Sequence, residues 1–267
     1  MMTLGNLICG FAAIHYAAKP LDSPGIGLRD WSAFTMAGLL IFVGMFFDAI
    51  DGAVARLTRS TSDIGAQLDS LADIVTFGVA PAYLTIRLVS LYYLTDSSAA
   101  SIISPDHDNA FGRLLWVIAA LYGCCAALRL ARFNAETPSG DIQDHMTFRG
   151  LPSPGAAGCV ASLILFHQAY IAELTYQWVA RTTGLAMAFI LLLCAFAMVS
   201  RLAYDHLINR HLRGHRSFAD IVLLTVLLIM TIMFPEPVLS IGFALYALSA
   251  PVRWIHRAWV HPLFSRA

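Results

Sequence analysis

Five of the chain's 14 aspartates fall within 26 residues, from Asp48 to Asp73. Asp48 and Asp51 are three residues apart in one apolar segment. In the next apolar segment, Asp69 and Asp73 are four residues apart. On an α-helix both spacings place the pair on one face, so two helices that fold back on each other would bring four carboxylates together. Asp63 falls outside this spacing and is predicted to be a helix N-cap.

Acidic side chains in apolar segments are costly, and by default they indicate a functional site. Carboxylates that share a site repel one another unless cations balance them, and ligands that are all oxygen suit hard ions. We therefore predict that Asp48, Asp51, Asp69 and Asp73 bind Mg²⁺ or Mn²⁺, as two ions, an arrangement suited to phosphoryl displacement. The alternative is a set of solvated aspartates at helix ends, which is common for one residue but does not explain all four.

The residues between the aspartates favour a phosphate substrate. Gly52 and Gly65 let a backbone or a ligand approach closely, and Ala55 keeps its helix face small. The planar guanidinium of Arg56 matches the geometry of a diphosphate.

The composition predicts that helices in a membrane carry this cluster. Hydrophobic residues make up 58% of the 267 residues and charged residues 13%, about half the share in soluble domains. Each apolar segment is close to the roughly 20 residues that span a bilayer, so we predict an all-α, polytopic bundle of about eight transmembrane helices. The segments are 2–18, 34–56, 64–92, 112–134, 154–174, 184–203, 219–234 and 236–255.

The basic residues predict the orientation. Twelve of the 17 Arg and Lys lie at the ends of the second, fourth and sixth segments, in the connections that follow these segments, or in the C-terminal part. The positive-inside rule then places both termini and the aspartates on the cytoplasmic side. No basic block or tail indicates nucleic acid.

The spacing D-x2-D-G-x2-A-R-x8-G-x3-D-x3-D resembles the signature of the CDP-alcohol phosphatidyltransferase family. Every position matches, and a chance match is improbable compared with most short motifs. The signature positions are Asp48, Asp51, Gly52, Ala55, Arg56, Gly65, Asp69 and Asp73.

The resemblance implies a core of six transmembrane helices in residues 1–203. Residues 204–267 would then add a basic cytoplasmic loop, two more transmembrane helices and a tail. It implies that Asp48, Asp51 and Asp69 bind metal, that Asp73 also contacts a metal and is the general base, and that the remaining signature residues line the CDP site. It further implies a homodimer in the bacterial cytoplasmic membrane that transfers a phosphatidyl group from CDP-diacylglycerol to an alcohol and releases CMP.

Three further stretches resemble the serine-using branch of that family, the CDP-diacylglycerol–serine O-phosphatidyltransferases. They are T-L-G-N-L-I-C-G from Thr3, R-L-A-R-F-N from Arg129, and F-R-G-L-P-S-P from Phe148. Within the first, Asn6 either lines the nucleotide pocket or bonds a neighbouring helix.

An amino-acid acceptor brings a carboxylate that must be bound. Arg129 and Arg132 share a helix face, and Ser153 before a proline is typical of an N-cap that opens a helix, whose N-terminus favours an anion. We therefore expect Arg129, Arg132 and Ser153, with Asn134 and Arg149 nearby, to bind L-serine. Arginines at these positions also follow from orientation alone, and Asn134 is alternatively a helix C-cap.

Competing interpretations remain open from the sequence. A sister enzyme would use glycerol 3-phosphate, inositol phosphate or choline with the same aspartates. A cation transporter would use the acidic cluster without the Gly, Ala and Arg positions, and a structural scaffold leaves the cluster unexplained.

Overall fold

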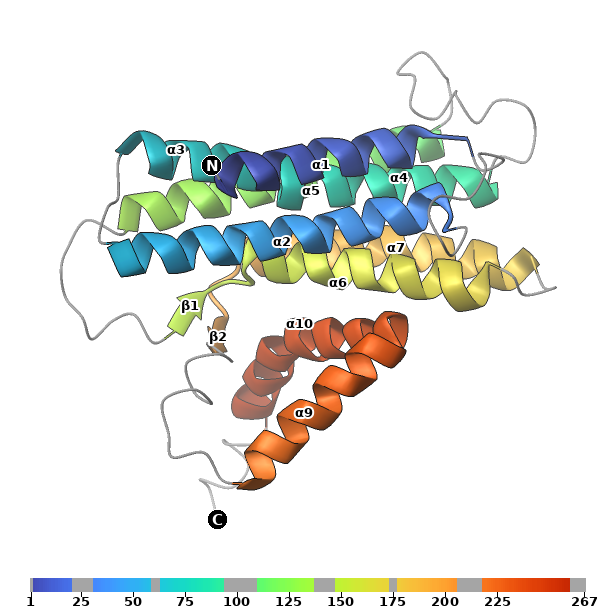
Figure 1. Cartoon of the computed structure of the whole chain (residues 1–267). Coiled ribbons are helices and arrows are strands. Elements are labelled where there is room, and N and C mark those ends of the chain that lie inside the picture. Colours follow the sequence, from blue (N-terminus) through green and yellow to red (C-terminus); the bar gives the residue numbers. More distant parts are fainter. Residues whose placement is uncertain are drawn as a thin grey trace.

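The computed structural model of the chain describes residues 2–20, 31–58, 63–93, 110–136, 147–172, 177–205 and 218–259. It is a bundle of long helices that run side by side, with two further helices set against one side (Figure 1). The predicted all-α membrane bundle is confirmed, and each of the eight apolar segments contains helix. The helices are α1 Met2–Ala18, α2 Ala33–Thr58, α3 Asp63–Asp73, α4 Ala80–Tyr93, α5 Ala110–Glu136, α6 Ser153–Phe166, α7 Gln177–Val199, α9 Phe218–Met233 and α10 Pro235–Trp259, with π-helical turns η1 Ile74–Val79 and η2 His167–Ile171.

Among the described residues, six helical spans are long and apolar enough to cross a membrane. They are 33–54, 64–92, 110–135, 153–171, 178–199 and 235–256. Helices α1 and α9 have only 17 and 16 residues, which at 1.5 Å per residue falls short of the roughly 30 Å hydrocarbon core. Large apolar side chains such as Phe11, Phe46 and Trp116 are exposed on the bundle, as expected where lipid rather than water is the solvent.

Small residues let the core helices approach closely. Ala37, Ala126, Ala157 and Ala161 are fully buried, and such residues favour close packing between helices in a membrane. The buried face of helix α1 also consists mostly of small residues. They are Thr3, Asn6, Cys9, Gly10, Ala13 and Ala17. Helix α1 packs against α2 and also against α3, η1 and α4.

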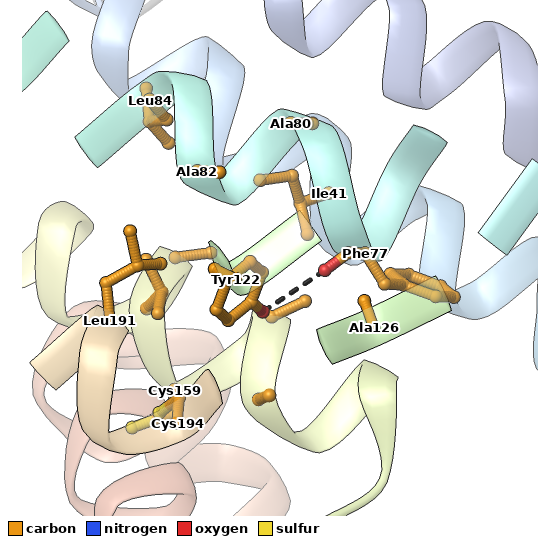
Figure 2. Packing of buried hydrophobic residues seen from close by; sticks show 14 of the residues in the cluster. Ile41, Phe77, Ala80, Ala82, Leu84, Tyr122, Ala126, Cys159, Leu191 and Cys194 are labelled. Carbon is orange, nitrogen blue, oxygen red and sulfur yellow. Dashed lines mark hydrogen bonds between the residues drawn. The ribbon is translucent and has the colours of Figure 1, made fainter. Parts of the chain in front are cut away.

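One predicted span, 64–92, is a single rod made of α3, η1 and α4. In η1 the backbone widens, and the amide of Ala80 donates to the carbonyl of Val75, five residues earlier. The buried Tyr122 of α5 donates its hydroxyl hydrogen to the carbonyl of Phe77 in this turn, at 3.1 Å (Figure 2). A π-helical turn loosens the regular ladder, so a side-chain donor from a neighbouring helix helps to fix it.

A short antiparallel ladder precedes α6 and was not predicted. Strand β1 (Thr147–Arg149) pairs with β2 (Ala203–Asp205), with Phe148 opposite Tyr204. Gly150 follows at φ +88°, where a side chain would also strike the carbonyl of Met198. This conformation suits glycine and turns the chain into α6.

Some predicted features lie outside the described residues. They include most of the basic loop after Asp205 and the C-terminal tail.

We expect Tyr122→Phe to lower the free energy of unfolding in detergent by about 1 kcal/mol, because the carbonyl of Phe77 loses its donor. Thermal unfolding followed by circular dichroism measures the change. Tyr83→Phe is the matched control, since the structure describes no hydrogen bond for that hydroxyl. Equal effects of the two variants would argue against a role for the hydrogen bond.

Candidate active site

Three aspartates meet at one end of the bundle. Asp48 from α2 and Asp69 and Asp73 from α3 each offer a carboxylate oxygen, and these atoms lie within 4.8 Å of one another. Asp73 is only 8% exposed, whereas Asp48 and Asp69 are half-buried. The helical spacings produce this convergence, because each pair of aspartates shares one helix face. The three are called the aspartate triad below.

Asp51 lies beside the triad rather than within it. Its carboxylate accepts a hydrogen bond from the hydroxyl of Thr3 on α1. It also interacts electrostatically with Asp48 and Asp69. The structure therefore brings three of the four predicted carboxylates into one group of ligand atoms and leaves the fourth adjacent, bonded to α1.

Helix α1 also fixes Asp73. Asn6 is fully buried, and its Nδ2 donates to Asp73 Oδ1 at 3.0 Å. The carbonyl of Asn6 accepts a hydrogen bond from Thr76 Oγ1 at 2.9 Å, so α1 is bonded on both sides of the junction between α3 and η1. The side-chain oxygen of Asn6 is buried and has no partner among the described residues. The predicted bond to a neighbouring helix is thus present, and one polar atom of the amide is still unsatisfied.

The other signature residues lie on the same helix ends. Gly52 follows Asp51 on α2, and Gly65 lies one helical turn before Asp69 on α3. Ala55 and Arg56 belong to the last turns of α2, and their side chains lie outside the described part of the chain. Asp63, predicted as an N-cap, is the first residue of α3, and its side chain is likewise not described.

Arg129 joins the aspartates to the start of α6. Its Nη1 donates to Ser153 Oγ at 3.0 Å, and its guanidinium interacts electrostatically with Asp73. Its Nε is buried and has no partner among the described residues. A buried donor without an acceptor is costly, so this corner of the site can accept an anionic or carbonyl oxygen.

One sequence prediction about helix ends is wrong, and one alternative is ruled out. The N-cap of α6 is Pro152, and no side chain caps the helix, because Ser153 is its first residue and accepts from Arg129 instead. Asn134 is not a C-cap, since α5 continues to Glu136. Its Nδ2 donates to Ser70 Oγ at 2.9 Å, which ties α5 to the helix that carries Asp69 and Asp73.

The two remaining arginines are less closely defined. Arg132 follows Arg129 by three residues on α5 and is half-buried. Arg149 ends β1, where its backbone pairs with Ala203, and its side chain is not described.

Two residues of the site were not predicted from the sequence: Thr3, which bonds Asp51, and Ser70, which bonds Asn134. The signal for Thr3 was present, because Thr3 and Asn6 are polar residues three apart in an apolar helix and so share a face. Ser70 carried no such signal, because its partner depends on how α5 crosses α3.

The donor set fits a hard divalent cation. All available ligands are carboxylate oxygens, the kind that Mg²⁺ and Mn²⁺ prefer. The guanidinium of Arg129 interacts electrostatically with Asp73 of the triad. One guanidinium does not balance three carboxylates, so a bound cation would relieve their repulsion.

Comparison with known proteins agrees with this geometry. The sequence model of the family described as CDP-alcohol phosphatidyltransferase matches residues 1–203. A CDP-diacylglycerol–serine O-phosphatidyltransferase of Helicobacter pylori J99 is 30% identical over 259 residues, which cover 96% of this chain and 90% of the relative.

Other similar proteins carry the same name. The enzyme of Bacillus subtilis 168 is 37% identical over 165 residues, covering 61% of this chain and 72% of the relative. That of Methanocaldococcus jannaschii is 42% identical over 118 residues, covering 44% and 45%. With the match over residues 1–203 and the aspartate triad in place, the chain belongs to the CDP-alcohol phosphatidyltransferase family.

Proposed function

We propose that the chain transfers the phosphatidyl group of CDP-diacylglycerol to the hydroxyl group of L-serine, giving phosphatidylserine and CMP. The observation that carries the proposal is the aspartate triad, in which a buried Asp73 is oriented by Asn6 and lies near Arg129. The names of the similar proteins from Helicobacter, Bacillus and Methanocaldococcus support serine as the acceptor.

Asp48, Asp69 and Asp73, with Asp51 beside them, would hold two Mg²⁺ or Mn²⁺ ions. Bound ions would neutralise the diphosphate and stabilise the charge that develops on it. Gly52, Ala55, Arg56 and Gly65 would line the site for the CDP moiety, with the guanidinium of Arg56 on the diphosphate.

Asp73 is the proposed general base. The hydrogen bond from Asn6 fixes its carboxylate, and a positioned carboxylate can take the proton of the serine hydroxyl. The serine oxygen then forms a bond to the phosphorus of the phosphatidyl group. The bond from that phosphorus to the CMP oxygen breaks, and CMP leaves with the electron pair.

Arg129 and Ser153 are the proposed binding site for the serine carboxylate. The free Nε of Arg129 supplies a charged donor, and the first turn of α6 supplies backbone N–H groups at the positive end of the helix dipole. The proposed serine site would also include two residues of α5, Arg132 and Asn134, and one residue of β1, Arg149.

The membrane setting is also a proposal. Six spans indicate a multi-pass protein, and the distribution of basic residues favours a site that faces the cytoplasm of a bacterial cell. We propose residues 1–203 as the catalytic core, residues 204–267 as an addition to it, and a homodimer, as the family resemblance implies. The lipid tails would stay in the bilayer while the head group reaches the triad.

The first test is a head-group assay in detergent micelles. We expect CMP release and a labelled phospholipid with CDP-diacylglycerol and serine, loss of both with a chelator, and recovery with Mn²⁺ or Mg²⁺. Asp73→Asn removes the base and should lower kcat by about 10²–10⁴-fold. CMP release that does not depend on serine, or that occurs only with another alcohol, would assign the chain to a sister activity.

Asn6→Leu tests the support of Asp73. Because Asn6 orients a proposed metal ligand, its loss should weaken Mn²⁺ binding by about 10–100-fold, measured by calorimetric titration in detergent. Cys9→Ala, one turn farther along the buried face of α1, is the control and should bind Mn²⁺ as the wild type does. Unchanged affinity in Asn6→Leu would remove Asn6 from the metal site.

Arg129→Ala tests the acceptor site. Loss of a hydrogen bond to a charged group costs about 1.5–3 kcal/mol, so the KM for serine should rise at least ten-fold. The KM for CDP-diacylglycerol should change much less. Arg113→Ala, at the other end of the same helix, controls for the loss of a charge. A rise in both KM values alike would place Arg129 outside the serine site.

A further inference from the structure

The last helix reaches the acceptor corner although it lies beyond the residues that the family model matches. The match ends at Ala203, whereas α10 begins at Pro235. Helix α10 lies along α6 (Figure 1), and Ser240 Oγ donates to the carbonyl of Ser162 at 2.7 Å. The contact continues towards the start of α6, where the proposed serine site lies.

Two glycines of α6 make room for aromatic rings of α10. A Cβ on Gly155 would lie 2.9 Å from Cε1 of Tyr246, and a Cβ on Gly158 would strike the ring of Phe243. Both rings therefore rest directly on the α6 backbone. Gly155 is two residues after Ser153, so Tyr246 packs against the same helical turn that bonds Arg129.

The β-ladder ties α10 to the same turn by a second route. Tyr204 of β2 is fully buried, donates to the carbonyl of Ala247 at 3.0 Å, and has its ring 5.7 Å from that of Tyr246. Burial raises the pKa of Tyr204 to about 12, so its hydroxyl stays protonated and keeps donating at neutral pH. Through Phe148 and Gly150, this ladder leads directly into α6.

The ring of Tyr246 therefore contacts the first turn of α6, and Ser153 in that turn bonds the guanidinium of Arg129.

We propose that Tyr246 is a positioning residue for the acceptor side of the reaction. Its ring, packed on Gly155, holds the first turn of α6 so that Ser153 and Arg129 keep the geometry that binds the serine carboxylate. The inference rests on the proposed function, and it assigns the C-terminal addition a part in the acceptor site.

The test compares the kinetics of the purified full chain and its variants in detergent micelles. Tyr246→Ala should raise the KM for serine about ten-fold, with less than a two-fold change in the KM for CDP-diacylglycerol. Tyr246→Phe keeps the ring and should restore the serine KM. Phe243→Ala, which removes the neighbouring ring from the same helix contact, should lower thermal stability while leaving the serine KM as in the wild type.

Gly155→Ala provides a variant that acts from the other side. The added methyl group would force the Tyr246 ring away from α6, and the serine KM should rise as it does in Tyr246→Ala. Equal serine KM values in Tyr246→Ala and Phe243→Ala, or a Tyr246→Phe enzyme that fails like the alanine variant, would overturn the inference. A wild-type protein without serine-dependent activity would instead overturn the proposed function.

Discussion

The mutual repulsion of three carboxylates at the end of a membrane bundle is the constraint around which the site is organised. Asp48, Asp69 and Asp73 are held with their oxygens within 4.8 Å of one another. Such an arrangement is unfavourable without compensation, and α1 and α5 supply part of it. Asn6 donates to one carboxylate and Arg129 lies near it, while Thr3 donates to Asp51 alongside. The remaining negative charge would favour a hard cation in the site.

The sequence predicted the parts of the structure that depend on local periodicity. The spacing of the aspartates was enough to place Asp48, Asp69 and Asp73 together, because a helix converts spacing into direction. Apolar segment length gave the helical spans, although α1 and α9 are shorter than a full crossing. The spans need no knowledge of which helices are neighbours, and the aspartates need only that the two consecutive helices α2 and α3 fold back on each other.

Features that depend on helix crossings escaped prediction. Ser153 was expected to be the N-cap of α6. In the structure its hydroxyl accepts a hydrogen bond from Arg129 of α5, and the N-cap residue is Pro152. The ladder of β1 and β2 joins residues more than 50 positions apart, and three-residue strands leave no alternation to detect. The contact of Tyr246 with Gly155 also depends on a helix crossing, because the residues next to each of them in the sequence do not predict it.

The π-helical turn η1 begins immediately after Asp73. Each residue of an α-helix advances the side-chain direction by about 100°, so the extra residue in a widened turn offsets everything that follows. The acidic face of α3 and the packing face of α4 therefore lie on one continuous helical segment but point in directions that an unbroken α-helix would not give them. Deleting one residue between Ile74 and Val79 would give a smoother helix and turn the carboxylates away from Asp48. The length of this segment therefore sets the direction in which Asp69 and Asp73 point relative to the packing face of α4.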